Sequence, residues 1–477
     1  MEPRILQSES VSQLTLWGLR GLTALDPDIL VMVHDDRLFL TSRNRLIADQ
    51  ALTADGDVTG WADTAVALAT LAMPISGPIR RAGTQGIVQS FFDELFNHLD
   101  PYSRYVSPRD AAEERARRTG EAGAGLRLVQ RNATIVVAAA IIDGPGAVAG
   151  IRPGDTILAV DGEPVRGSDA DKVSARIAGP EDTTVTITWR GRDGRVRSTE
   201  LERVLVPPET VVPQRVSDML IVQITAFDRS TGVHLAHAIQ DGLTGSHPPD
   251  GIVVDLRGNR GGLLRQAVSA ADELLSPGIV AVTAGRDPEA NEIWRSTTGE
   301  LAENMPVVVL VDGRTASAAE FLAAALADRG RGVVVGSATL GKGLVQTIAP
   351  LPDGGELFVT WSRVLAPRGW PIQGLGVLPQ VCTSLGQNAL ATQLAALAEG
   401  QQPMAQALII HRSARAPVPP AQVLAIRSAC PAAEGNEADL EAARVLIRNP
   451  AAYAAALLPP LRETGSLSLS SGDRGDH

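Results

Sequence analysis

The chain is poor in aromatic residues and in cysteine. Only 3% of its 477 residues are Phe, Trp or Tyr, so its cores must be built from Val, Leu, Ile and Ala. The two cysteines, Cys382 and Cys430, form no C-x-x-C pattern, and no H-E-x-x-H occurs, which argues against a structural zinc site. A G-x-S-x-G elbow, typical of α/β-hydrolases, is also missing.

Long apolar runs are missing as well, and the first residues do not have the pattern expected of a signal peptide. No uninterrupted apolar run reaches the roughly 18 residues that span a bilayer, since AVALATLAMPI is short and meets Pro74. The start, MEPRILQSES, lacks the apolar core of a signal peptide. We therefore expect a cytoplasmic protein, or a natural start upstream of the given one. The net charge of −11 argues against nucleic acid or an anionic membrane surface as the partner.

The length predicts two to four domains, and the patterning separates them. Residues 1–118 are expected to be mainly helical, since VQSFFDELFNHL has apolar residues at helical spacing. Residues 119–205 carry short β-like runs and one helix in SDADKVSARIAG, with Ser168 or Asp169 as its cap.

The second half of the chain has a different pattern. Residues 206–385 alternate strand, loop and helix, which predicts a largely parallel sheet with function at the carboxyl ends of its strands. Residues 386–465 are Ala- and Leu-rich and are expected to be helical. The polar tail, 466–477, is expected to be disordered.

Lys342, in GSATLGKGLVQTIAPL, poses the main functional question. The stretch begins like a phosphate-binding loop, but Gly343 stands where Ser or Thr should be. A strand-like segment follows, whereas such a loop needs a helix after its lysine. The alternative is a general base, because burial can lower the pKa of a lysine by several units. Its nucleophile would be Ser317 in VDGRTASAAEF, although a serine at such a place is more often a helix cap.

The combination of motifs resembles the carboxy-terminal processing peptidases, which are tail-specific serine proteases. The resemblance rests on five stretches: T-A-S-A-A-E at 315–320, G-K-G at 341–343, V-Q at 345–346, VVDLRGNRGGLL at 253–264 and LDPYSRY at 99–105. Residues 122–203 resemble the family's inserted PDZ module, most specifically in AGIRPGDTILAVDG. Where the family has P-D after G-x-G-I, this chain has Gln380, which puts the substrate path in question rather than the chemistry.

The resemblance implies a role for each matched residue. Ser317 would attack the peptide carbonyl, Lys342 would be the base, and Gln346 would orient it. The oxyanion hole would use the backbone N–H of Ala318 and of one glycine of GNRGG, either Gly261 or Gly262. Taken alone, Glu320 is interpreted as a solvated acid in the first turn of a helix.

The PDZ-like module implies a site for the substrate's C-terminus. Its loop would be Gly123, Ala124, Gly125 and Leu126, and the apolar pocket would be completed by Val173 and Ile177 at i and i+4.

Together these features predict an α/β serine endopeptidase with a mostly parallel, crotonase- or Clp-protease-like core, an inserted PDZ domain and flanking helical segments. It would need no metal or cofactor, would cleave proteins or peptides with a free C-terminus, and would be periplasmic or exported by resemblance. The alternatives are an inactive PDZ scaffold and a nucleotide-binding protein. A homo-oligomer, and pairing of Cys382 with Cys430, are left open.

Overall fold

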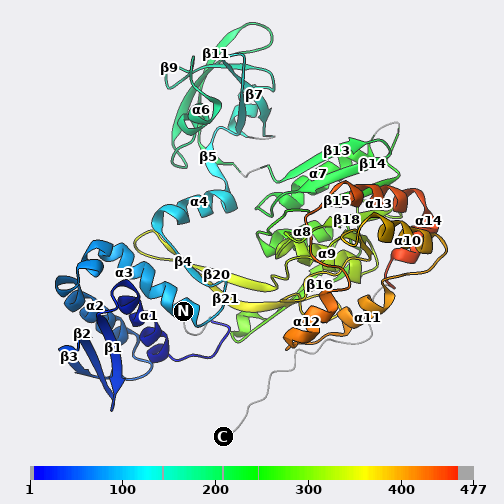
Figure 1. The fold of residues 1–477 in the computed structure, drawn as a ribbon. Coiled ribbons are helices and arrows are strands. Elements are labelled where there is room, and N and C mark those ends of the chain that lie inside the picture. The colour runs from blue at the N-terminus through cyan, green and yellow to red at the C-terminus, as the bar shows by residue number, and fades with distance from the viewer. Residues whose placement is uncertain (1–4, 142–143, 207–208, 245–246, 460–477) are drawn as a thin grey trace. The chain divides into compact units, whose positions relative to one another are not determined.

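The structure is a computed structural model that describes residues 5–141, 144–206, 209–244 and 247–459 (Figure 1). The chain forms two compact units. The first comprises Met1–Thr210, Asp228–Ser230 and Gln346–Trp361, and the second comprises Val211–Phe227, Thr231–Val345 and Ser362–His477. The tail 466–477, predicted to be disordered, lies outside the described residues.

The N-terminal part of the first unit combines helices with a small sheet. Its helices are α1 (Val11–Leu25), α2 (Val58–Ile75) and α3 (Gly77–Asn97). The antiparallel sheet β1-β2-β3, which the sequence interpretation did not anticipate, comprises β1 (Ile29–His34), β2 (Arg37–Ser42) and β3 (Arg45–Ala51). Both hairpin loops consist of two residues with positive φ, the geometry that matches strand twist.

Helix α2 continues through Pro74 and is the one helix among the described residues long and apolar enough to cross a membrane. Its mean hydropathy is 1.3, and 22% of it is buried. This result rests on length and composition only, and helices buried in protein cores pass the same test. Leu68 and Ala72 of α2 pack into the core beneath the small sheet.

The first unit continues through a linking helix into a second module. β4 (Arg104–Val106) pairs with β21 (Glu356–Leu365), and α4 (Pro108–Thr119) follows it. The short strands β5 (Glu121–Gly123) and β12 (Val204–Val206) pair where the chain enters and leaves the module.

The module is a sheet ordered β11-β10-β8-β7-β6, with β9 paired to β8. Its strands are β6 (Leu126–Arg131), β7 (Thr134–Ala140), β8 (Thr156–Val160), β9 (Glu163–Pro164), β10 (Thr184–Arg190) and β11 (Val196–Glu202). Its helices are α5 (Pro145–Val148) and α6 (Ala170–Ile177). Of the two predicted caps of α6, Asp169 is the cap, because its carboxylate accepts from the Lys172 N–H at 2.8 Å.

The second unit is built on a sheet of order β13-β14-β15-β18-β19-β22, whose strands are parallel from β14 onward. Its strands are β13 (Val211–Val216), β14 (Met219–Ile224), β15 (Gly251–Asp255), β18 (Val307–Val311), β19 (Val333–Gly336) and β22 (Val381–Cys382). The parallel sheet predicted from strand–helix alternation is therefore present, while the likeness to crotonase and Clp-protease folds stays a prediction.

Both faces of this sheet are covered by helices (Figure 1). Side chains of a strand alternate between the faces, so Val254 and Val309 point one way and Val253 and Val308 the other. The first face packs against α7 (Thr231–Leu243), α8 (Leu264–Asp272) and α9 (Ala318–Asp328). The second packs against α10 (Gln387–Ala398), α13 (Glu437–Arg448) and α14 (Pro450–Ala456).

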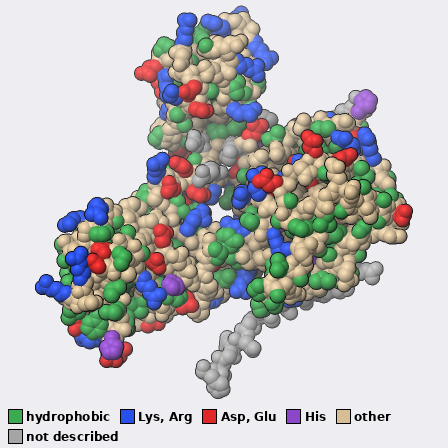
Figure 2. All heavy atoms as spheres, in the orientation of Figure 1, with side chains coloured by type: hydrophobic (Ala, Val, Ile, Leu, Met, Phe, Trp, Pro, Cys, Tyr) green, Lys and Arg blue, Asp and Glu red, His purple; other side chains and the backbone are tan. Residues whose placement is uncertain are grey.

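Further elements lie outside these layers. They are β16 (Gly278–Gly285), η2 (Pro288–Ala290), β17 (Glu292–Ser296), β20 (Leu344–Pro350), α11 (Ala405–Ser413) and α12 (Pro420–Arg427). A disulfide joins Cys382 on β22 to Cys430 just after α12, which resolves the pairing that the sequence left open. Acidic and basic side chains are interspersed on the face of the molecule shown in Figure 2.

Candidate active site

The loops that follow three neighbouring parallel strands build the candidate site. After β15 comes the glycine-rich loop of VVDLRGNRGG, after β18 the loop to Ser317, and after β19 the loop to Lys342. Since β15, β18 and β19 are adjacent and parallel, their carboxyl ends meet at one edge of the sheet. The fold thus gathers segments that are far apart in the chain.

Ser317 lies at the junction between its loop and helix α9 with a backbone that serine rarely adopts. Its φ of 54° and ψ of −123° place it in a strained region, which is common at functional sites. The surrounding contacts hold it there: the Ala316 N–H donates to the Asn259 carbonyl at 2.9 Å. A Cβ on Gly261 would lie 2.7 Å from the Ser317 Cβ, so only glycine allows the two loops to approach this closely.

The interpretation of Glu320 as a solvated acid in the first turn of a helix is wrong, because its side chain is fully buried. Its carboxylate accepts from the N–H groups of Ser317 at 2.8 Å, Lys342 at 2.8 Å and Gly341 at 2.7 Å. The Thr339 hydroxyl donates to it as well, at 2.5 Å. Burial raises the pKa of this carboxyl, and the four hydrogen bonds oppose that rise. One side chain therefore fixes the backbone of both candidate catalytic residues.

Lys342 is held between two glycines whose backbones are engaged on either side. The Gly374 N–H donates to the Gly341 carbonyl at 2.9 Å, and the Gly343 N–H donates to Gln373 Oε1 at 3.0 Å. Strand β20 begins at Leu344, directly after this loop. The predicted strand is confirmed. A phosphate-binding loop requires a helix at this position, so the strand argues against a nucleotide site.

Gln346 belongs to the first unit, whereas Ser317 and Lys342 belong to the second. Within its unit, the Gln346 Nε2 donates to the backbone carbonyl of Tyr102, in the stretch LDPYSRY. The carboxamide oxygen of Gln346 is therefore the atom suited to accept a further hydrogen bond. Its predicted action on Lys342 stays a prediction.

The candidate oxyanion donors differ in what they contact. Among the described residues, the N–H of Ala318 has no acceptor, as expected for the first residue of a helix. The Gly261 N–H, next to Ser317, donates to the Asn259 side chain at 2.7 Å. The Gly262 N–H has no acceptor within the described ranges. Of the two glycines, Gly261 is the nearer to the serine and Gly262 has the uncommitted donor.

Several positioning residues escaped the sequence interpretation. Asn259 is fully buried, and its Nδ2 donates to the Ile224 carbonyl at 2.7 Å, which ties the glycine loop to β14. Arg257 bonds Asp255 and Asp439 and so anchors α13 to the same loop. Their signal was the D-L-R-G-N stretch itself, whose polar side chains follow a buried strand.

Gln380, considered in the sequence as part of the substrate path, has a structural role instead. It is fully buried, its Oε1 accepts from the Val334 N–H at 2.9 Å, and its Nε2 donates to the Gly332 carbonyl at 3.2 Å. The glutamine thus satisfies the backbone of β19.

The candidate PDZ peptide site is only partly open. Val173 and Ile177 are 0% and 4% exposed and pack into the core of the module, so neither presents a free surface to a ligand. In the loop Gly123 to Leu126, the carbonyls of Ala124 and Gly125 accept from Gly146 and Ile141. The Gly125 N–H has no acceptor among the described residues.

Comparisons with known proteins identify the family of the chain. The family described as Peptidase family S41 matches residues 218–383, and the PDZ domain matches residues 136–191. The carboxy-terminal-processing protease of Bartonella bacilliformis is 33% identical over 305 residues, which cover 62% of this chain and 69% of that protein.

Two further relatives are covered to different extents. A probable CtpA-like serine protease of Staphylococcus aureus is 32% identical over 310 residues, covering 63% of this chain and 61% of that protein. The match thus spans about three fifths of that relative's length. The solved photosystem II D1 C-terminal processing protease is 25% identical with a TM-score of 0.38, covering 80% of this chain and 97% of that one.

An α/β core with a strained serine at a strand–helix junction, a lysine loop bound to the same buried glutamate and a PDZ domain defines a serine peptidase. The chain belongs to peptidase family S41, among the carboxy-terminal-processing proteases.

Proposed function

We propose that this peptidase cleaves proteins or peptides near a free C-terminus with a Ser-Lys-Gln site of Ser317, Lys342 and Gln346. The supporting observation is the buried Glu320 carboxylate, which binds the backbone N–H groups of both Ser317 and Lys342. Such a shared anchor keeps the nucleophile and the base in register, as catalysis by a positioned pair requires.

The proposed reaction is acyl transfer through the serine. Neutral Lys342 Nζ takes the proton of the Ser317 hydroxyl as Oγ attacks the peptide carbonyl. The Ala318 N–H, together with the Gly261 or Gly262 N–H, stabilises the oxyanion. The protonated lysine then gives its proton to the leaving amine, and water hydrolyses the acyl-enzyme by the same route. Gln346 accepts a hydrogen bond from Nζ and orients it.

We further propose that the PDZ domain binds the C-terminus of the substrate and that the protein works in an exported, periplasmic compartment. The Gly125 N–H, which has no acceptor in the described part of the chain, supports the first point, because PDZ domains hold a carboxylate with loop N–H groups. The Cys382–Cys430 disulfide supports the second, because such bonds persist in oxidising compartments.

The test is cleavage of an unstructured protein by the purified chain and its variants. Ser317→Ala should abolish cleavage, and Lys342→Arg should lower kcat by at least about 10²-fold, because a guanidinium cannot act as a base near neutral pH. Substantial activity in the arginine variant would show that the site needs a charge and not a base. An inactive wild-type protein that still binds the substrate would favour the alternative of a PDZ scaffold.

A further inference from the structure

A cavity adjoins the lysine loop, and its walls come from two parts of the second unit. It has a volume of about 710 Å³, within the range of ligand pockets. One part is the core, through Leu340, Arg363, Pro371, Gln373 and Gly374. The other is the segment around α12, through Ala416, Pro417, Val418, Pro420, Val423, Leu424 and Arg427. This second segment lies outside the S41 match at 218–383.

The core wall of this cavity is bonded directly to the catalytic loops. Leu340 stands two residues before Lys342, and its N–H donates to the carbonyl of Thr315, two residues before Ser317, at 3.0 Å. On the other side of the lysine, Gln373 Oε1 accepts from the Gly343 N–H at 3.0 Å. The core wall of the cavity is therefore held by the same loops that carry Ser317 and Lys342.

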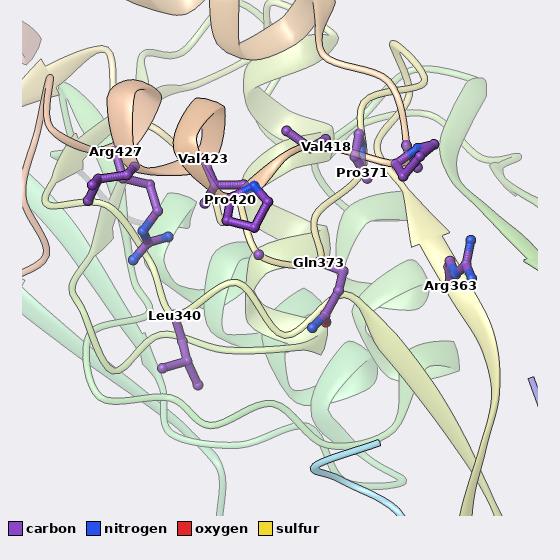
Figure 3. A pocket seen from close by; sticks show the side chains of 12 residues that line it. Leu340, Arg363, Pro371, Gln373, Val418, Pro420, Val423 and Arg427 are labelled. Atoms are coloured by element: carbon purple, nitrogen blue, oxygen red, sulfur yellow. The ribbon is translucent and has the colours of Figure 1, made fainter. Parts of the chain in front are cut away.

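The described residues of the lining are mainly apolar, and the charged ones among them are both arginines. Figure 3 shows Val418, Pro420 and Val423 of the segment around α12 close together. Leu340 and Gln373 of the core wall lie across the cavity from them. Leu340 is 43% exposed and Leu424 is 73% exposed, so the wall of the cavity presents apolar side chains that an apolar ligand group can cover. Arg363 and Arg427 lie at opposite ends of the view, and Arg427 is anchored by donating to the Leu375 carbonyl at 2.8 Å.

We propose that this cavity is a specificity pocket for a large apolar side chain of the substrate, such as Leu, Met or Phe, within a few residues of the cleaved bond. The inference rests on the proposed proteolytic function, which supplies a peptide as the occupant. Burying a larger apolar side chain adds binding energy with each methylene. The two arginines disfavour Lys or Arg at the same substrate position, because like charges would meet in a partly desolvated site.

The experiment compares peptides that differ at one position. A set with free C-termini carries Leu, Ala or Lys in turn at each of the positions flanking the cleaved bond. At one position, kcat/KM should be about tenfold or more higher for Leu than for Ala, and lowest for Lys. Val423→Ala should reduce the Leu-to-Ala ratio about three- to tenfold, and Leu424→Lys, at an exposed position that cannot unfold the core, should reduce it too. The control Ile409→Ala, which removes an exposed apolar side chain on α11 outside the cavity, should leave the ratio unchanged.

Binding to the Ser317→Ala protein separates this inference from the proposed function. Fluorescence anisotropy with the same peptides should show the Leu preference, and Leu424→Lys in the Ser317→Ala background should lose it. Cleavage without a Leu preference at any position, or a preference that both cavity variants retain, would overturn the pocket while leaving the protease intact. A wild-type protein that cleaves nothing but binds with this preference would overturn the protease and keep the pocket.

Discussion

Glu320 shows how much one side chain decides in this molecule. A carboxylate with four donors and no exposure is costly to bury unless every acceptor position is used. Here the donors come from the two candidate catalytic loops, one of which includes Thr339. The hydrogen bonds of this carboxylate therefore hold the backbone of Ser317 and Lys342 in place.

We predict that Glu320→Gln will reduce both activity and stability. The amide replaces one acceptor oxygen by an NH₂ group that faces N–H donors, so at least one buried donor is left unsatisfied at about 1–3 kcal/mol each. kcat should fall more than about tenfold, and the melting temperature should drop. Both are measured on the purified variant by steady-state kinetics and thermal denaturation.

The matched control is Glu303→Gln, because Glu303 is exposed in the same unit. It should keep wild-type kcat and melting temperature. If Glu320→Gln behaved like this control, the carboxylate would not be what positions the site.

At the scale of elements, α11 carries a second buried polar group of a different kind. His411 is fully buried, its ring contacts Trp370 edge-on at 4.4 Å, and its Nε2 is 2.8 Å from the Gly376 carbonyl. Burial, and then the neighbouring Arg412, lower the pKa of His411 from 6.5 to about 3. Arg412 itself bonds Asp328 at the end of α9, so α11 docks through a polar core.

Because of His411, we expect the free energy of unfolding to fall as the pH is lowered. Because its pKa is lower in the folded protein, the unfolded chain binds a proton below about pH 6.5 that the folded protein takes up only near pH 3. The associated stability is thus fully present above pH 6.5 and is lost as pH falls through this window, by an amount on the order of a few kcal/mol.

The measurement is the free energy of unfolding between pH 5 and 7, above the range where most carboxylates titrate. His411→Gln keeps a donor for the Gly376 carbonyl but cannot titrate, so its pH slope in this window should be smaller than that of the wild type. His34→Gln, at an exposed position in the first unit, should keep the wild-type slope. Identical slopes for all three proteins would contradict the assignment.

At the scale of the whole molecule, the proposed function divides proteolysis and substrate recognition between two domains. The S41 match and the PDZ match cover separate stretches of chain, 218–383 and 136–191. A peptide with a free C-terminus should therefore be cleaved faster than the same peptide with an amidated end, because amidation removes the carboxylate that the loop would bind.

The comparison is made with one fluorogenic peptide in both forms, on the full chain. kcat/KM should fall about tenfold or more on amidation, mainly through KM. Gly125→Val, at a glycine with φ of 70°, should abolish the difference between the two peptides, since a β-branched residue is strained there. Equal cleavage of both peptides by the wild type would show that this chain does not select free ends.

Local patterns in the sequence determined a large part of this protein. Strand–helix alternation predicted the parallel sheet, because burial on both faces leaves apolar runs such as VVVLV at 307–311. The β-branched stretch after Lys342 predicted a strand rather than the helix of a nucleotide site. The PDZ module was recognised from a short motif, and Ser317 and Lys342 were predicted as catalytic residues from motifs whose residues are neighbours in the chain.

Only the tertiary structure decided the features that depend on distant segments. In the sequence Glu320 is an ordinary acid of a first helical turn, but in the fold it is buried against the Lys342 loop. Val173 and Ile177 have the spacing of pocket residues in the sequence, but in the fold they pack into the core of the PDZ domain. The cavity shared by Leu340 and α12 likewise arises from contacts between distant segments. Periodicity and spacing report which face of an element is apolar, whereas burial depends on what packs against that face, and this is set by the whole fold.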